Sequence, residues 1–334
     1  MLRFTVRRLL QAIPTLLVLS ILVFAWLRVL PGGPAGALLG DKATPESLAA
    51  MRRLMGLDEP IIVQYFKFLG RVFTGDFGNS LASGDAVISE IGRRFPATIE
   101  LSVCALVLAI VFGIPMGYLA ARYRGRLLDN AAVITTLVGV AVPVFFLGVL
   151  LKYIFAQKLG VLPPSGRQDV TIDATHVTGF FVLDGLLTGE FDAAWDAIKH
   201  LILPSIALAS IPFAVIVRIT RASVLDVQQE DFVRTAESKG LTTQVIRRRH
   251  VLRNALLPVS TTIGLQTGLL LAGAVLTEKV FNWQGLGSLL AEGIERRDFP
   301  RLQGLLLLAA AVYVLVNLLV DISYAIIDPR VRVR

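Results

Sequence analysis

Residues that could carry chemistry are sparse in this chain. No Gly-x-x-x-x-Gly-Lys-Ser/Thr segment occurs in its 334 residues, so it lacks the loop that cradles nucleotide phosphates. The three histidines, His176, His200 and His250, lie far apart, and no His-Glu-x-x-His or Cys-x-x-Cys spacing is present. This pattern predicts neither a metal site nor a catalytic triad. We therefore expect a chain that is not an enzyme and has no cofactor of its own.

One charged segment, residues 220–254, has the signals of a short helix. Glu230 and Asp231 stand where such a helix would begin, and Lys239 stands near its end, in agreement with the helix macrodipole. Gly240 follows as a natural residue for the left-handed position after a helix. The spacing predicts about ten helical residues. We expect the apolar residues of this helix to be exposed unless a partner covers them; these are Phe232, Val233 and Ala236.

A polar pair stands in an apolar stretch further along the chain. Thr262 and Gln266 are four residues apart, so a helix places them on one face. They could line a polar pathway or form hydrogen bonds between helices, and the sequence leaves both readings open. Other charges within the apolar stretches are few, which argues against a proton-coupled carrier.

The elements that must position these residues are membrane-spanning helices. The chain is 54% hydrophobic and only 17% charged, which is too apolar for a soluble domain of this length. A bilayer core needs about 20 apolar residues per helix. Six stretches meet that requirement and predict an all-α membrane protein, namely residues 9–27, 101–121, 131–151, 201–219, 255–276 and 305–327. The first stretch is too long for a signal peptide, so we expect it to stay as a helix.

The distribution of basic residues predicts the orientation. With the N-terminus placed inside the cell, the inner segments hold 17 Lys and Arg against 6 acids, and the outer segments hold 16 against 18. Because Lys and Arg concentrate on the cytoplasmic side of membrane proteins, both termini are expected to be cytoplasmic. The net charge of +8 is thereby explained by the lipid bilayer, with no nucleic-acid partner.

This topology divides the chain into three parts. Residues 1–30 form the N-terminal end and first helix, residues 31–98 a periplasmic segment, and residues 99–330 a five-helix core. The core includes a periplasmic loop over 157–200 and the cytoplasmic loop over 220–254. Apolar residues at helical spacing predict an amphipathic helix over 61–73, packed on the protein's own outer face. A short helix is expected over 193–198, and a turn with Trp283 near the membrane interface.

Several segments together resemble the first permease subunit of bacterial dipeptide ABC importers, within the wider oligopeptide, nickel and glutathione permease group. The resemblance runs over almost the whole chain. The segments that carry it are Met-Gly-Leu-Asp-Glu-Pro (55–60), Gly-Asp-Phe-Gly-Asn-Ser (75–80), Arg-Phe-Pro-Ala-Thr-Ile-Glu-Leu (94–101), Arg-Thr-Ala-Glu-Ser-Lys-Gly-Leu (234–241), His-Val-Leu-Arg-Asn-Ala-Leu-Leu-Pro (250–258) and Asp-Pro-Arg (328–330).

The resemblance implies a type I ABC importer permease fold and a coupling role for the loop over 220–254. Residues 234–258 resemble the signature called the EAA loop, which docks into a cleft on the ATPase subunit in this family. Arg234, Thr235 and Ala236 stand where Glu-Ala-Ala is usual, and Gly240 matches the signature glycine. A role of glutamate at the first position therefore does not carry over. Gly33 stands where relatives commonly have aspartate, so no function of that acid carries over either.

The implied assembly is a heteromeric importer in the bacterial inner membrane. It contains this chain, a second similar permease, two ATPase subunits that bind ATP and Mg²⁺, and a periplasmic binding protein. The implied substrates are dipeptides or other small peptides. Within the same class of importer, haem, δ-aminolevulinate, glutathione and nickel stay open as alternative substrates. A secondary transporter or a channel stays open as an alternative class of protein.

Overall fold

The computed structural model describes residues 2–29, 33–40 and 43–327 of the chain. The secondary structure elements of these residues are all helices, and these residues form no β-sheet. The long helices are α1 (Leu2–Val29), α5 (Val87–Arg122), α6 (Leu127–Ala141), α9 (Phe191–Val227), α12 (Arg253–Val280) and α14 (Phe299–Ile327). Four helices are long and apolar enough to cross a membrane, and the number is six if each of two bent pairs is one span. The predicted all-α membrane protein is confirmed.

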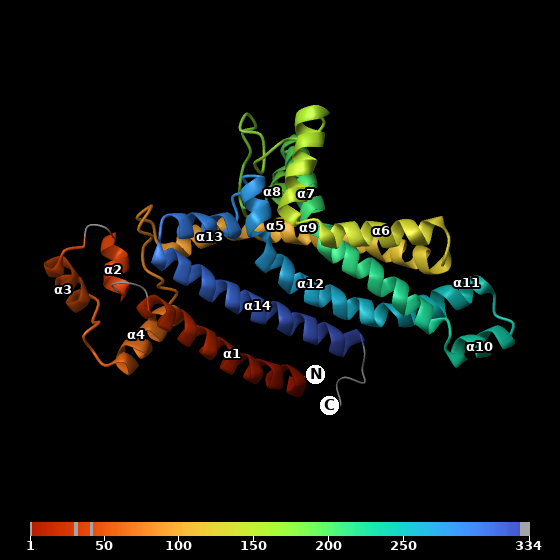
Figure 1. Cartoon of the computed structure of the whole chain (residues 1–334), viewed down its shortest axis with the longest axis horizontal. Helices are drawn as coiled ribbons and strands as arrows, with labels where there is room; N and C mark the ends of the chain where they lie inside the picture. Colours follow the sequence, from red (N-terminus) through yellow and green to blue (C-terminus); the bar gives the residue numbers. More distant parts are fainter. Residues whose placement is uncertain (1, 30–32, 41–42, 328–334) are drawn as a thin grey trace.

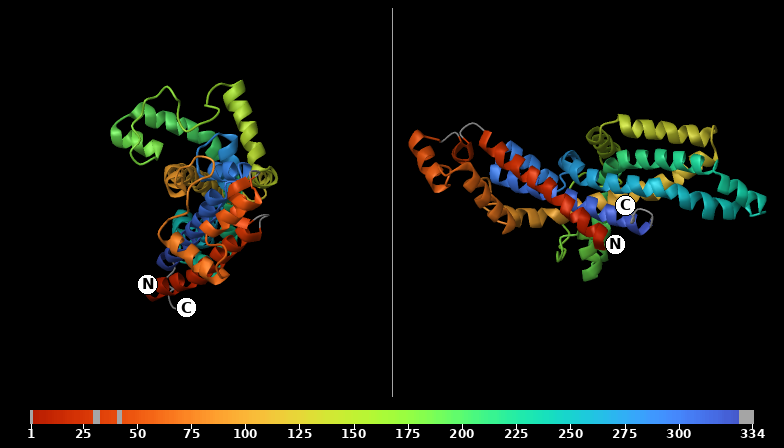
Figure 2. Two further views of the ribbon diagram at one scale, coloured as in Figure 1. Left: turned by 90° about the vertical axis from the view of Figure 1, so that its left-hand side faces the viewer. Right: turned by 90° about the horizontal axis from the view of Figure 1, so that it is seen from below.

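Shorter helices lie between and beyond the long ones. They are α2 (Gly33–Leu39), α3 (Pro45–Leu54), α4 (Ile61–Phe73), α7 (Val144–Leu151), α8 (Phe181–Thr188), α10 (Asp231–Ser238), α11 (Thr243–Val245), α13 (Leu286–Glu295) and the π-helices η2 (Lys152–Lys158) and η3 (Ile246–Leu252). The molecule is elongated, with α2 to α4 at one end and α10 and α11 at the other (Figure 1). The beginning of α1 lies beside the end of α14 (Figures 1 and 2).

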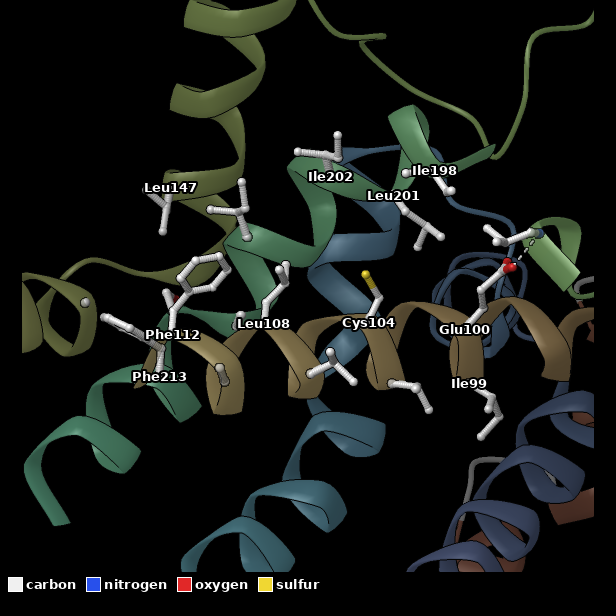
Figure 3. Close-up of a pocket in the computed structure, with 18 of the residues that line it drawn as sticks. Ile99, Glu100, Cys104, Leu108, Phe112, Leu147, Ile198, Leu201, Ile202 and Phe213 are labelled. Atoms are coloured by element: carbon white, nitrogen blue, oxygen red, sulfur yellow. Dashed lines mark hydrogen bonds between the residues drawn. The ribbon is translucent and has the colours of Figure 1, made fainter. Parts of the chain in front are cut away.

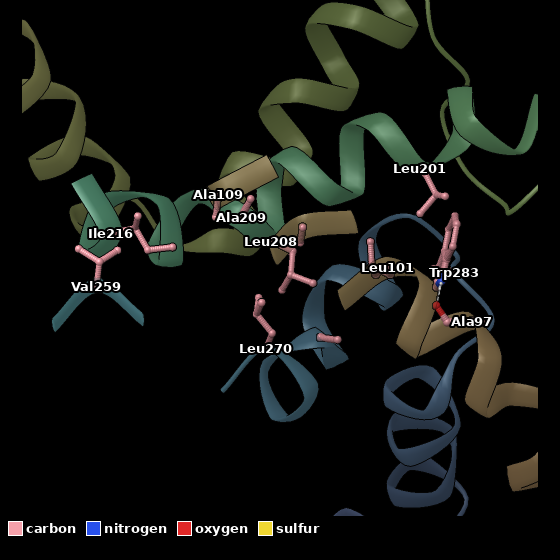
Figure 4. Close-up of a cluster of buried hydrophobic side chains, with 12 residues drawn as sticks. Ala97, Leu101, Ala109, Leu201, Leu208, Ala209, Ile216, Val259, Leu270 and Trp283 are labelled. Atoms are coloured by element: carbon pink, nitrogen blue, oxygen red, sulfur yellow. Dashed lines mark hydrogen bonds between the residues drawn. The ribbon is translucent and has the colours of Figure 1, made fainter. Parts of the chain in front are cut away.

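Helix α9 is the centre of the bundle. It packs against α5, α6, α7, α8 and α12, and 67% of its most apolar window is buried, against 11% for α1 and for α14. Small residues let α5 approach it closely: a Cβ added at Gly117 would lie 2.6 Å from the carbonyl oxygen of Val217. The surrounding core contains Leu101, Leu208 and the other residues drawn in Figure 4. Helices α5 and α9 therefore form the most tightly packed pair of the core.

The third predicted span, residues 131–151, is broken into two helices. Helix α6 ends at Ala141, and α7 starts at Val144 in a direction that differs by 106°. Pro143 precedes α7, and proline has no N–H to continue the hydrogen bonds of α6. The short helix expected over 193–198 is also not separate, because these residues belong to the first two turns of α9.

The amphipathic helix predicted over 61–73 is confirmed as α4. It packs against α1 through an aromatic cluster in which the Phe24 ring lies 5.1 Å from the Tyr65 ring and 5.4 Å from the Phe68 ring. Tyr65 also shares a hydrogen bond of 2.8 Å with Ser20. The helix thus packs on the protein's own surface, as predicted, while Ile62 and Phe73 stay exposed.

Candidate functional site

Helix α10, in the segment 220–254, has the ends that the sequence predicts. Glu230 is its extended N-cap residue, with ψ of 145°, and Lys239 is its C-cap residue. Gly240 follows with φ of +74°, a left-handed conformation that glycine adopts without strain. Its N–H donates to the Glu237 carbonyl at 2.9 Å and helps to close the helix end. The predicted helix is therefore confirmed, whereas its role in coupling stays a prediction.

The burial of α10 corrects the prediction about its apolar residues. Val233 and Ala236 are each only 4% exposed, so the expectation that they need a partner to cover them is wrong. The chain turns back after Gly240, and η3 and the start of α12 cover this face. The covering cluster contains Ala121, Val224, Ile246, Val251 and Ala255. The inner face of α10 is thus fixed to α9 and to η3 of the same chain, and Phe232 remains 41% exposed.

The outward face of α10 carries the other predicted site residues. Glu230, Asp231, Arg234 and Thr235 are all exposed. The carboxylate of Asp231 lies 3.8 Å from the Arg234 guanidinium, and both side chains are largely in water, so this pair contributes little to stability. The Thr235 hydroxyl donates to the Asp231 carbonyl of its own helix at 2.9 Å. The polar groups of this face therefore remain accessible for a partner.

A bidentate ion pair fastens the same end of the molecule and was not expected from the sequence. Arg221 of α9 donates from Nε to Asp129 Oδ1 at 2.6 Å and from Nη2 to Asp129 Oδ2 at 2.9 Å. Asp129 also accepts from the Gly125 N–H at 2.9 Å. Two parallel charged hydrogen bonds fix both distance and orientation. The pair therefore connects α6 and the turn before it to the last turns of α9, close to α10.

The predicted pathway residues Thr262 and Gln266 both lie in α12. The Thr262 hydroxyl donates to the Pro258 carbonyl of the same helix at 3.0 Å, and Gln266 is 8% exposed. Two residues further along α12, a Cβ added at Gly268 would lie 3.2 Å from the Tyr313 ring of α14. Neither residue lines the two large cavities described next. Their role in the pathway stays a prediction.

The first cavity is an apolar groove of about 1130 Å³ between α5, α6, α7, α8 and α9 (Figure 3). Leu108, Phe112 and Phe213 are among its walls. The Glu100 carboxylate stands at its rim, where it accepts from the Val182 N–H at 2.9 Å. A charged solute would lose its hydration here with few polar groups to replace it, so this groove does not suit a polar cargo.

Two buried polar networks hold the opposite end of α5. In the first, Arg301 of α14 donates to the Glu90 carboxylate from Nε at 2.9 Å and from Nη2 at 2.6 Å, and Ser80 donates to Asp298 at 2.6 Å. All four side chains are buried. Sequence reasoning missed this network because residues such as Ser80 and Asp298 are 218 positions apart, and no local spacing indicates their contact.

The second network surrounds Glu278 of α12. Its carboxylate accepts from the Thr98 hydroxyl at 2.7 Å and from the Ser288 N–H at 2.8 Å. Nearby, the indole of Trp283 donates to the Ala97 carbonyl at 2.9 Å (Figure 4). Trp283 is 1% exposed, so its ring packs inside the protein, and its position near the membrane interface stays a prediction. The indole and the carboxylate fasten the α12–α13 turn to α5.

Comparison with known proteins covers the whole chain. Residues 113–333 match the family described as binding-protein-dependent transport system inner membrane component, and residues 1–102 match the N-terminal family of such membrane components. The dipeptide transport system permease protein DppB of Alkalihalophilus pseudofirmus is 42% identical, covering 99% of this chain and all of the relative. DppB of Escherichia coli is 44% identical over 99% of both chains. The glutathione transport system permease protein GsiC of Salmonella paratyphi A is 39% identical, again over 99% of both.

Proposed function

We propose that this chain, which belongs to the inner membrane components of binding-protein-dependent transport systems, is one permease subunit of an ATP-driven importer for dipeptides or similarly small peptides. The observation that carries this proposal is identity of 42% and 44% to dipeptide permeases over 99% of the chain. The helical architecture supports it, since the described residues contain up to six apolar spans, with α9 at the centre of the bundle.

The proposed assembly contains this chain and four further subunits. A second permease completes the pathway, two ATPase subunits bind ATP and Mg²⁺, and a periplasmic protein delivers the peptide. The proposed location is the bacterial inner membrane with both termini in the cytoplasm, because 17 Lys and Arg against 6 acids then lie on the cytoplasmic side. The neighbouring ends of α1 and α14 are consistent with termini on the same side.

The segment 220–254 is the proposed coupling element to the ATPase. The inner face of α10 is fixed by Val233 and Ala236 against Val224 of α9, while its outer face presents Phe232 and polar groups to the cytoplasm. A push on α10 is therefore transmitted to α9 as a rigid-body movement rather than absorbed by a flexible loop. Phe232 is the exposed apolar residue most suited to contact the ATPase.

Replacement of Phe232 tests the coupling. In the reconstituted importer, Phe232→Ser should lower both peptide uptake and the stimulation of ATPase activity by loaded binding protein, because an apolar contact is lost. Leu127→Ser, at a residue that is 87% exposed at the same end of the molecule, is the matched control and should behave as wild type. Wild-type uptake and stimulation in Phe232→Ser would remove Phe232 from the mechanism.

Thr262 and Gln266 are proposed to border the pathway within α12. Gln266→Leu should change the rate of peptide uptake while the purified subunits still assemble. If the variant fails to assemble and shows no selective transport defect, Gln266 has a structural role between helices instead.

The substrate is tested with the complete importer in proteoliposomes. ATP-dependent uptake of a radiolabelled dipeptide in the presence of the binding protein is the expected result, with unlabelled dipeptides as competitors. Glutathione is the main comparison, since the glutathione permease of Salmonella paratyphi A is 39% identical. Uptake of glutathione, haem, δ-aminolevulinate or nickel without uptake of dipeptides would overturn the proposed substrate.

A further inference from the structure

A second, polar cavity of about 860 Å³ lies beside the first turns of α5. Its walls come from three segments that are distant in sequence: residues 85–96, residues 166–181 and residues 282–289. Helix α13 packs on α5 at this place, and the turn between α12 and α13 closes the wall. In the proposed orientation this cavity opens on the periplasmic side. Its volume falls in the range of about 300–1,000 Å³ that is typical of small-molecule sites.

Most charges in the walls of this outer polar cavity already have partners. Arg93 contacts the Asp85 carboxylate at 2.6 Å, and Glu90 is held by Arg301. Arg167 contacts the Glu100 carboxylate at 2.7 Å with only 9% of either side chain exposed. These pairs fix the walls and leave the cavity itself lined by groups of both signs.

Two arginines retain unused capacity to donate hydrogen bonds. Arg94 makes only long contacts, at 3.4 Å to the Ser288 hydroxyl and at 3.8 Å to the Glu292 carboxylate, and 27% of its side chain is exposed. The Nε of Arg167 is buried and has no hydrogen-bond partner among the described residues. A buried donor without a partner is costly. An anion bound in the cavity would supply acceptors to the exposed donors of Arg94, while the buried Arg167 adds positive charge behind this wall without direct contact.

One wall presents a flat aromatic surface. The rings of His176 and Phe181 are stacked with centroids 3.9 Å apart, and the Arg167 guanidinium lies 3.7 Å from the Phe181 centroid. Such a surface accommodates an apolar side chain next to a charged group. Asp85, whose side chain is 51% exposed, adds a negative group to the same lining.

We propose that the outer polar cavity binds the small zwitterionic peptide before it enters the membrane, with the peptide's C-terminal carboxylate on Arg94. The inference rests on the proposed function and deepens it, since it names a site for the peptide on the permease itself. Walls of both signs suit a molecule that carries a carboxylate and an ammonium group. The outer face of the exposed His176 ring receives a peptide side chain, and Asp85 faces the ammonium end.

The test measures binding to the assembled importer in nanodiscs without its binding protein. Isothermal titration calorimetry compares L-alanyl-L-alanine with its C-terminal amide, which lacks the carboxylate. The free acid should bind about tenfold to a hundredfold more tightly than the amide, as expected for loss of a hydrogen bond to a charged group. Arg94→Gln should weaken binding of the acid by a similar factor and leave binding of the amide nearly unchanged.

Arg296→Gln is the matched control, because Arg296 is an exposed arginine at the end of α13 outside the cavity lining. It should bind both peptides as the wild type does. If Arg94→Gln does not assemble, the comparison of acid and amide on the wild type still decides the question. Equal binding of the two forms would overturn the proposal.

Three further results distinguish failure of the proposed site from failure of the proposed function. If dipeptides are taken up with the binding protein present but show no binding to the importer alone, the site is refuted and the proposed function stands. If Arg94→Gln binds L-alanyl-L-alanine normally but has lost affinity for the binding protein, the cavity is a docking place for that protein and the proposal is wrong. Absence of dipeptide uptake in the complete system refutes the proposed function itself.

Discussion

The close approach of α5 to α9 at Gly117 can be tested by adding a single methyl group. A Cβ at Gly117 would lie 2.6 Å from the Val217 carbonyl oxygen and 2.7 Å from the Cβ of Thr220, well inside the 3.4 Å at which ordinary contact begins. The first of these atoms belongs to the backbone, which cannot rotate away. Gly117→Ala must therefore push the two helices apart.

The loss of stability caused by this clash follows from comparison with Gly92 in the same helix. A Cβ at Gly92 would meet nothing within 4 Å, so Gly92→Ala brings only the gain of alanine over glycine in a helix, about 0.5–1 kcal/mol. Gly117→Ala brings the same gain and in addition an overpacking cost of about 1–3 kcal/mol. The difference between the two variants therefore isolates the cost of the clash.

Thermal unfolding of the purified importer measures this difference. The midpoint of Gly117→Ala should fall below that of Gly92→Ala, because the overpacking cost lowers the free energy of unfolding of the core. Peptide uptake by Gly117→Ala should fall as well, since α9 leads directly into α10. Equal midpoints for the two variants would refute the reasoning that α5 and α9 are in close contact at this point.

Three further predictions concern the loops. Gly240→Val should lower ATPase stimulation in the reconstituted importer. A Cβ at this position meets no atom within 4 Å, so the loss of stability, about 1–2 kcal/mol, comes from the left-handed backbone alone. Gly240→Asn should behave more nearly as wild type. Burial opposes ionisation of Asp184, yet its hydrogen bonds from the Thr178 hydroxyl and from the Thr178 and Gly179 N–H groups outweigh this and lower its pKa. The contribution of Asp184 to stability is present above the unfolded pKa and is lost as the pH falls through the lowered value. The protection of the Gly179 amide, measured as its hydrogen exchange rate relative to the intrinsic rate at each pH, should therefore fall below about pH 4 in the wild type and show no such pH dependence in Asp184→Asn. Topology is tested with single cysteines in a Cys104→Ser background and an impermeant thiol reagent added outside the cell. Cysteines at Gly84, Asp173 and Arg297 should react, and cysteines at Arg126 and Ser238 should not. Labelling at Arg126 or Ser238 would contradict the predicted orientation.

The features that the sequence predicts are those with local causes. Helix α10 follows from a short-range pattern, an acidic start at Asp231 and a glycine at position 240, and the spans follow from uninterrupted apolar length. Pro143 marks the break in the third span, but no local sequence signal gives the 106° change of direction. Local signals thus indicate where elements begin and end, and not how they turn.

The missed features depend on contacts between distant segments. The inner face of α10 is buried because η3 folds back onto it, and residues 246–252 read in the sequence mainly as a basic run. The ion pair of Asp129 with Arg221 spans 92 positions. A signal was present in the apolar pair Val233 and Ala236, since their three-residue spacing matches one helix face, but its partner could not be identified from spacing.

The same contacts connect the two proposed sites. Arg94 lies near the beginning of α5, and Gly117 near the end of α5 packs closely against α9. Helix α9 in turn packs against α10 through Val224. At about 1.5 Å per residue the 36 residues of α5 extend about 54 Å. In the proposed mechanism, a movement of α10 by the ATPase displaces a wall of the outer polar cavity through α9 and α5. Coupling between two sites is reciprocal. If the position of α10 changes the affinity for a peptide at Arg94, the bound peptide shifts the equilibrium between the positions of α10 by the same free energy.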